Sequence, residues 1–571
     1  MIDVRAVRSL RLLALVVALV MPPMLGKAIA QTPVAATESA EFQHPGSTRR
    51  LILTYGTLQV PLSLEALETF SRSGQLMPAL SPYLAALDPQ LQHQFRQQLR
   101  FRLGLERSQL AQFLSSPMGE LLLSVPEDLL HGSQPGLLRQ VVLQAAATPE
   151  GLTLLNVIRH LPQDTRVDLK QAMQLWQEQQ AIAQATRQQL EQIDRQIEQQ
   201  IEQSVHRPVG QLNNQPSSAI ATPPAPFPSD SRDLRQPGES RFEKQTLQLD
   251  DAKRDRRFQA DLYLPTQAQA QTQIASQPQT PLIILSHGLG ADRQSQSFFA
   301  RHLASHGIAA AVVQHPGSDS HQLQAMLQGK TQDVLDVSAF VERPRDVSYL
   351  LDALERRNDL QRRLRLNRVG VYGHSLGAYT ALALAGAKIN FGQLKQDCQP
   401  RQYAFDLSLI LQCRARDLPQ RDYHLQDSRV VALLLFDPVS RSILGQQGLG
   451  AVRVPVLWGG SDADVLTPLL TEQLPAFSHL GSAEKYLGII EAVQHVNLKL
   501  DRLTTTQNWA ETKLIDAKPE AFQNYVNALG LAFTQVYVAE RSEYRPYLSA
   551  SYGRWLSQSP HRLRFLPQAH L

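Results

Sequence analysis

The chain has little cysteine and almost no excess of charge. Its 571 residues include only two cysteines, Cys398 and Cys413, and neither has the spacing or neighbouring histidines of a metal site or a cysteine nucleophile. A disulfide between them is one expectation, and two buried free thiols are the alternative.

The formal net charge is +4, but residues 1–30 hold four basic residues against one acidic, and the remainder has 52 basic and 51 acidic residues. This balance gives no support to nucleic-acid binding.

The N-terminal apolar run is too short to cross a membrane. It comprises the nine residues Leu12–Val20 and is soon followed by two prolines, whereas a spanning helix needs about twenty residues. Arginines precede the run, and Ala28-Ile-Ala30 follows it as a small-x-small cleavage site. These features predict a signal peptide over residues 1–30, a mature start at Gln31 and a periplasmic or secreted protein. An uncleaved anchor is the alternative, and no cysteine follows the site to suggest a lipoprotein.

The rest of the chain divides by composition and periodicity. Apolar residues at spacings of three and four predict a mainly helical domain over residues 50–204, with a strand at Leu51–Tyr55. Its last part, Asp168–Gln203, is polar with a thin apolar stripe; we expect a helix lying on a neighbouring part, with a coiled-coil seam as the alternative. Seven prolines between residues 205 and 240 indicate a linker.

Residues 241–545 alternate between strand and helix patterns, and residues 546–571 are left as a C-terminal extension. The expected strands are Thr246–Asp250, Phe258–Leu264, Pro281–Leu285, Ile308–Val313, Arg368–Tyr372, Val430–Phe436, Val454–Trp458 and Tyr486–Ile490. Apolar strands separated by helical crossovers predict an α/β fold, with a mostly parallel sheet covered by helices on both faces. Ligands bind such sheets at the carboxyl ends of the strands.

The segment Gly-His-Ser-Leu-Gly predicts an exposed nucleophile. Ser375 lies between Gly373 and Gly377, directly after the strand Arg368–Tyr372 and before the apolar helix Ala378–Ala385. A serine on a sharp strand-to-helix turn needs small neighbours, because β-carbons there would collide with the adjoining strand and helix. Chance alone produces this five-residue pattern in roughly one such chain in ten, so its context carries the hypothesis.

A serine nucleophile needs a base and an acid that follow it in the sequence. His495, after the last expected strand, is in the position for the base, because a loop at the carboxyl edge of the sheet brings it over Ser375. Three aspartates compete for the acid. Counting back from Pro468, which we expect to start a helix, favours Asp464. Counting forward from Gly459, directly after the expected strand Val454–Trp458, favours Asp462. Asp437 follows the end of the preceding strand, Val430–Phe436.

Two further segments belong to the expected site. The glycines of Ser286-His-Gly-Leu-Gly290 allow the amide of Leu289 to face a substrate, with the amide of Leu376 as its partner in an oxyanion hole. An insertion over residues 388–428 contains the apolar run Leu407–Leu411, which is typical of either a cap that favours acyl chains or a surface excursion with its own small core.

Four motifs together resemble one branch of the α/β-hydrolases. They are His287-Gly-Leu-Gly-Ala-Asp292, His315-Pro-Gly-Ser318, Arg343-Pro-Arg-Asp-Val347 and Gly373-His-Ser-Leu-Gly377. Over residues 240–540 the chain is similar to platelet-activating-factor acetylhydrolases and dienelactone-hydrolase relatives. The resemblance implies an α/β-hydrolase fold. In the acetylhydrolases the acid follows the strand that corresponds to the one ending at Asp437 here, whereas most other branches place the acid after the next strand. Dienelactone hydrolases carry cysteine as the nucleophile at this turn, and serine here favours ester chemistry.

The helical domain resembles the module of unknown function that precedes exported cyanobacterial α/β-hydrolases, which implies no activity of its own.

The expectation is an exported serine hydrolase that cleaves carboxylic esters through an acyl-enzyme. The resemblance implies short-acyl or phospholipid-like esters, contact with a membrane surface at most, and no metal or organic cofactor. Acyl transfer to another acceptor and peptide hydrolysis are alternatives on the same residues. A non-catalytic envelope binding or scaffold protein is the alternative from another class. Oligomeric state has no signal in the sequence.

Overall fold

The computed structural model describes residues 50–85, 89–103, 107–131, 134–206, 232–266, 279–493, 495 and 519–568. The predicted signal peptide, the mature start at Gln31 and most of the predicted linker lie outside these residues. Among the described residues, no helix combines the length and the apolar character that a bilayer crossing requires.

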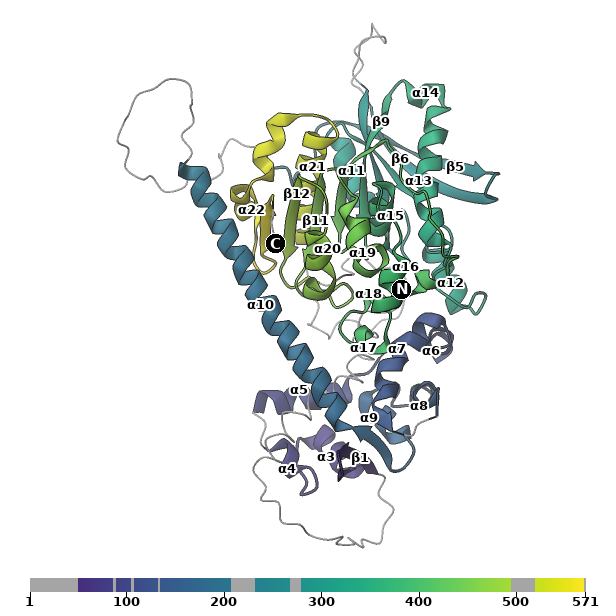
Figure 1. Cartoon of the computed structure of the whole chain (residues 1–571), viewed down its shortest axis with the longest axis vertical. Helices are drawn as coiled ribbons and strands as arrows, with labels where there is room; N and C mark the ends of the chain where they lie inside the picture. Colours follow the sequence, from purple (N-terminus) through teal and green to yellow (C-terminus); the bar gives the residue numbers. More distant parts are fainter. Residues whose placement is uncertain are drawn as a thin grey trace.

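A nine-stranded sheet forms the centre of the larger part (Figure 1). Its order is β13-β12-β11-β10-β9-β7-β8-β6-β5, and every neighbouring pair from β12 to β8 is parallel. The strands are β5 (Phe242–Asp251), β6 (Arg256–Pro265), β7 (Thr280–Ser286), β8 (Ala309–Val313), β9 (Leu364–His374), β10 (Val430–Phe436), β11 (Val456–Ser461), β12 (Lys485–Ile490) and β13 (Leu563–Pro567). The mostly parallel α/β sheet expected from the sequence is therefore present.

Helices cover both faces of this sheet, because successive residues of its strands point to opposite sides. In β7, Leu282 and Ile284 belong to one hydrophobic core and Ile283 and Leu285 to the other. The surrounding helices are α11 (Ser297–Ser305), α12 (Ser320–Leu327), α13 (Ala339–Glu355), α14 (Asn358–Gln361), α15 (Leu376–Leu384), α19 (Arg441–Gly450), η2 (Leu469–Gln473), α20 (Leu474–Ser478), α21 (Pro519–Tyr537), η3 (Ser542–Leu548) and α22 (Ala550–Leu556).

The edge strand β13 changes one expected boundary. It pairs antiparallel with β12, from Tyr486 opposite Pro567 to Ile490 opposite Leu563. The segment expected as a C-terminal extension therefore completes the main sheet. The short pattern Leu563–Pro567 has no turn signal linking it to β12, which is why the sequence did not reveal the pairing.

The N-terminal part combines helices with a small sheet that includes the expected strand at Leu51–Tyr55. Its sheet has the order β2-β1-β4-β3, built from β1 (Arg50–Tyr55), β2 (Leu58–Ser63), β3 (Leu130–His131) and β4 (Thr165–Asp168). Its helices are α3 (Leu64–Ser73), α4 (Ser81–Leu84), α5 (Pro89–Arg100), α6 (Arg107–Leu114), α7 (Pro117–Asp128), α8 (Leu137–Ala146) and α9 (Leu154–His160). Strand β4 follows β1 by more than one hundred residues, so this pairing has no local sequence signal.

A 38-residue helix, α10 (Leu169–His206), connects the two parts and runs along the larger one (Figure 1). Near its C-terminal end, Asp194 forms an ion pair with Arg564 at 3.0 Å and Gln200 donates to the carbonyl of Pro567 at 2.9 Å. Ile193, Ile197 and Ile201 are buried. The polar helix therefore lies on a neighbouring part of its own chain, as its thin apolar stripe predicted.

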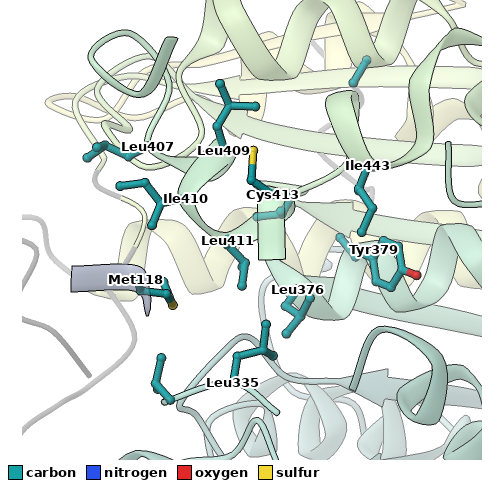
Figure 2. Close-up of a cluster of buried hydrophobic side chains, with 14 of the residues drawn as sticks. Met118, Leu335, Leu376, Tyr379, Leu407, Leu409, Ile410, Leu411, Cys413 and Ile443 are labelled. Carbon is teal, nitrogen blue, oxygen red and sulfur yellow. The ribbon is translucent and has the colours of Figure 1, made fainter. Parts of the chain in front are cut away.

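The insertion before β10 folds into short helices between the two parts. These are α16 (Phe391–Asp397), α17 (Pro400–Tyr403), α18 (Ser408–Gln412) and η1 (Cys413–Asp417), and a disulfide joins Cys398 to Cys413. Figure 2 shows Met118 of α7 beside Ile410 and Leu411 of this insertion, in one apolar cluster with Leu376. We call the helices α16 to η1 the cap. It packs on the N-terminal part with one side and on the sheet domain with the other.

Candidate active site

Ser375 lies on a strained turn between β9 and α15. Its backbone has φ 56° and ψ −118°, outside the regions that side-chain-bearing residues prefer. The turn is tight enough that a β-carbon on Gly373 would lie 2.2 Å from the carbonyl oxygen of Gly377. A β-carbon on Gly377 would lie 2.0 Å from the carbonyl oxygen of Ser286. Glycine at both positions is therefore required by the packing of the turn.

Three residues from three strand ends form one hydrogen-bonded chain. The Oγ of Ser375 lies 2.9 Å from Nε2 of His495, and Nδ1 of His495 lies 2.6 Å from Oδ2 of Asp464. Because Nδ1 faces a carboxylate, it carries the proton, and Nε2 is left to accept from the serine hydroxyl. This is the arrangement in which histidine can take a proton from serine.

The glycine-rich segment after β7 lies directly against the serine. A β-carbon on Gly288 would be 3.4 Å from Cβ of Ser375. The segment is fixed by its own backbone, since Gly290 donates to the carbonyl of Ser318 at 2.8 Å and Ala291 donates to that of Gly288 at 3.3 Å. Leu289 is thus held beside the nucleophile, and Leu376 begins the helix that follows it.

Two family models match parts of the chain. One, described as platelet-activating factor acetylhydrolase, isoform II, matches residues 259–339, which include β7 and the glycine-rich segment. The other, described as alpha/beta hydrolase of unknown function (DUF1400), matches residues 47–168. The sheet and the two matches together show an α/β-hydrolase fold. No curated protein matches it.

The second match covers the N-terminal part of the hydrolase rather than the sheet that carries Ser375. Residues 47–168 contain the small sheet and helices α3 to α9, and they end where α10 begins. The likeness to the acetylhydrolase branch comes from the first match, which includes the motifs at residues 287–292 and 315–318.

In the hydrolase, Asp464 is held by several donors. The amides of Leu466 and Thr467 donate to its Oδ1 at 2.7 and 3.1 Å, and the hydroxyl of Thr467 donates to its Oδ2. Burial raises the pKa of Asp464, but the charge and hydrogen bond of His495, with these donors, bring it below its usual value. Burial likewise lowers the pKa of His495, and the Asp464 carboxylate outweighs it, so the pKa is raised. Thr467 was not singled out from the sequence, because its contact with Asp464 becomes visible only in the folded turn.

The other two aspartates have different surroundings. Asp462 accepts the amide of Ala492 at 2.7 Å, where it fixes the turn after β12 that leads to His495. Asp437, at the end of β10, is buried, and its Oδ1 has no hydrogen-bond partner among the described residues. Burial and the nearby Asp464 charge raise the pKa of Asp437 to about 8. The hydrogen bond to His495 therefore belongs to Asp464, not to the position that the acetylhydrolase resemblance implied.

One group of side chains in the described part of the hydrolase could hold a metal ion. Ligand atoms of His374, Asp437 and His495 lie within 4.8 Å of one another. Both ring nitrogens of His495 already bond to Ser375 and Asp464, so an ion would have to displace one of these partners. Burial lowers the pKa of His374 to about 3, which keeps its ring neutral.

Proposed function

We propose that the hydrolase is an exported serine enzyme that cleaves carboxylic esters through an acyl-enzyme intermediate. The observation that carries this proposal is the chain of two hydrogen bonds from Ser375 through His495 to Asp464, at 2.9 and 2.6 Å. The strained backbone of Ser375 and the glycine-rich segment beside it support the same conclusion.

Each residue then has one task in the reaction. Oγ of Ser375 attacks the ester carbonyl as its proton passes to Nε2 of His495, and the carbonyl oxygen becomes an oxyanion. The amides of Leu289 and Leu376 donate to this oxyanion. The imidazolium gives its proton to the leaving alkoxide, which departs as the alcohol. A water molecule then repeats the sequence on the acyl-enzyme, releasing the carboxylic acid and restoring Ser375.

Asp464 keeps the histidine in the useful tautomer and stabilises the positive charge that forms on it. Its own ionised state is favoured by the hydroxyl of Thr467 and by backbone amides, so it remains a carboxylate while His495 gains and loses a proton.

Short-acyl or phospholipid-like esters are the substrates we propose. The acetylhydrolase match includes the glycine-rich segment that would bind the oxyanion. The cap adds the apolar side chain of Leu411 near Leu376, and Ile443 of α19 lies in the same cluster (Figure 2). These apolar side chains favour an uncharged acyl group over a charged one.

Export is proposed from the N-terminal sequence and from the cap. The Cys398–Cys413 disulfide persists in an oxidising compartment and is rare in a reducing cytosol.

A fluorophosphonate probe tests the proposed nucleophile. We expect one adduct on the wild-type protein, located at Ser375 by peptide mass spectrometry, and none on Ser375→Ala. Ser73→Ala, which changes an exposed serine of α3, is the matched control and should label like the wild type. Absence of labelling on folded wild-type protein would refute the proposal. A series of p-nitrophenyl esters from acetyl to dodecanoyl then measures the acyl preference.

A further inference from the structure

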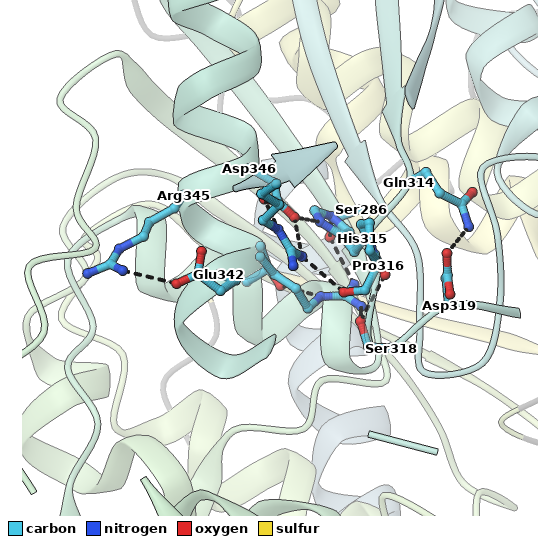
Figure 3. Close-up of polar contacts among 12 residues, drawn as sticks. Ser286, Gln314, His315, Pro316, Ser318, Asp319, Glu342, Arg345 and Asp346 are labelled. Atoms are coloured by element: carbon cyan, nitrogen blue, oxygen red, sulfur yellow. Dashed lines mark hydrogen bonds and ion pairs between the residues drawn. The ribbon is translucent and has the colours of Figure 1, made fainter. Parts of the chain in front are cut away.

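Behind the glycine-rich segment lies a buried polar network that the reaction above does not use. Figure 3 shows Ser286, His315 and Asp346 joined in a line, with Ser318 close by. The Oγ of Ser286 lies 3.0 Å from Nε2 of His315, and Nδ1 of His315 lies 3.1 Å from Oδ2 of Asp346. All three residues are fully buried, so no substrate reaches them. The network can act only through the groups that it holds.

Arg343 of α13 lies at the centre of this network and is itself fully buried. Its Nε donates to the hydroxyl of Thr380 at 3.1 Å, and Nη1 donates to that of Ser318 at 2.9 Å. Its Nη2 donates to the hydroxyl of Ser286 at 3.2 Å and to the carbonyl of His287. One planar guanidinium therefore bonds to three separate segments of the chain.

These three segments are the ones that carry the proposed oxyanion donors. Thr380 is in α15, one turn after Leu376. His287 precedes Leu289 by two residues. Gly290 directly follows Leu289, and its amide donates to the carbonyl of Ser318 at 2.8 Å. Arg343 thus fixes the start of α15 and both sides of Leu289 relative to one another.

The remaining bonds give the network a single orientation. Since Nδ1 of His315 faces the Asp346 carboxylate, its Nε2 accepts the hydroxyl proton of Ser286, whose oxygen then faces Arg343. Burial lowers the pKa of His315 well below its ordinary value, which keeps the ring neutral. The amide of His315 in turn donates to Nε2 of His287 at 3.2 Å.

Two arginines nearer the solvent hold the Asp346 carboxylate in place. Asp346 also accepts from Arg256, with Nε to Oδ1 at 2.6 Å, and from Arg254 at 3.1 Å. A buried guanidinium is stable only with its donors satisfied and a carboxylate nearby. The arrangement therefore commits several buried charges to a place where apolar packing would suffice for stability alone.

We propose that Arg343 is a positioning residue for the oxyanion hole: it sets the separation and direction of the Leu289 and Leu376 amides. The inference rests on the proposed ester hydrolysis, because that reaction places an oxyanion between these amides. A misplacement of about 1 Å in such a site can cost about 10²-fold in rate.

The test compares one severe and two milder variants with one control. Arg343→Lys keeps the charge but loses the planar fork, and Thr380→Val and Ser318→Ala each remove one acceptor. Arg429→Lys is the control: Arg429 has a similar number of partners, including Asp427 at 2.7 Å and Glu355 at 3.0 Å, but precedes β10 at the opposite end of the sheet.

Two kinetic readouts separate positioning from simple folding support. We expect Arg343→Lys to lower kcat about 10²-fold with KM changed less than about threefold, because the donors act on the transition state. Thr380→Val and Ser318→Ala should lower kcat by roughly 3- to 10-fold. The affinity for a trifluoromethyl ketone, which forms an oxyanion on Ser375, should fall in proportion to kcat/KM across the series.

The milder variants keep the test decisive if Arg343→Lys does not fold. Folded variants with unchanged kcat, or a ketone affinity that does not follow kcat/KM, would overturn the proposal. So would an equal loss in Arg429→Lys. Failure of the proposed function looks different: the wild type itself would then neither cleave esters nor label with the fluorophosphonate.

Discussion

Replacing Asp437 by asparagine should stabilise the protein at neutral pH. The carboxyl lies buried beside Asp464, and one of its oxygens has no hydrogen-bond partner among the described residues. Burial and the Asp464 charge raise its pKa from 3.8 to about 8, so the folded protein holds a proton that the unfolded chain has released. An amide of nearly the same shape has no proton to retain.

The size of the effect follows from this pKa difference. Below about pH 4 the carboxyl is protonated in both states, and it costs nothing. As the pH rises, the unfolded state loses the proton and the folded state keeps it, so the wild type loses stability until about pH 8. Each pKa unit corresponds to about 1.4 kcal/mol, which gives an upper limit of about 4 kcal/mol at pH 7. Since the amide is also buried, we expect a gain of about 1 to 4 kcal/mol.

Denaturant unfolding at pH 4, 5.5, 7 and 8.5, followed by tryptophan fluorescence, measures this difference. Trp458 lies fully buried in the neighbouring strand β11 and reports on the relevant domain. Asp250→Asn, which changes an exposed carboxylate with a 61% accessible side chain, is the control and should show no pH-dependent gain. The reasoning is refuted if the stability difference between Asp437→Asn and the wild type does not grow between pH 4 and 8.

Three further predictions concern the acid, the cap and the contact between the two parts. Asp464→Asn should lower kcat by about 10⁴-fold. The Asp464 carboxylate raises the pKa of His495 above 6.5, and His495 must be neutral to act as the base. The midpoint of the acidic limb of the kcat/KM profile should therefore move to lower pH in the variant. Equal activity of variant and wild type would contradict this. Replacing Cys398 and Cys413 by serine should lower the free energy of unfolding by about 3 kcal/mol, because the disulfide joins residues that lie 15 positions apart. Denaturant titration measures this loss, and a reducing agent should lower the free energy of unfolding of the wild type but not of the variant. Met118→Ala should cost about 2 to 3 kcal/mol in the same assay, since the residue is only 8% exposed in the cluster beneath the cap. A loss below 0.5 kcal/mol would argue against that contact.

The features of the site that depend on neighbouring residues could be predicted from the sequence, whereas those that depend on contacts between distant segments could not. The strand-to-helix turn at Ser375 was predictable because its glycines and flanking patterns lie within a few residues of it. The position of His495 followed from strand order alone. The choice among Asp437, Asp462 and Asp464 depended on which strand end faces the histidine, a property of the assembled sheet.

The buried network was unpredictable for a related reason. Arg343 and Asp346 were noticed as part of a resemblance, but their partners come from segments up to 92 residues away. A charged residue in a helix pattern ordinarily indicates a solvent-exposed face. Only the folded structure, in which Arg343 bonds to Ser286, Ser318 and Thr380, shows that this side chain faces inward.

The length of helix α10 sets the direction in which the buried residues at one end point relative to those at the other end. Its first turns bury Leu169, Ala172 and Leu175, and its later turns bury Ile193, Ile197 and Ile201 against the larger part. In an α-helix each added residue turns everything beyond it by about 100° and advances it by about 1.5 Å. One residue inserted midway would thus point the isoleucines away from β13, whereas seven would restore their direction about 10 Å further along. Length changes in this helix are therefore tolerated in steps of whole heptads, if at all.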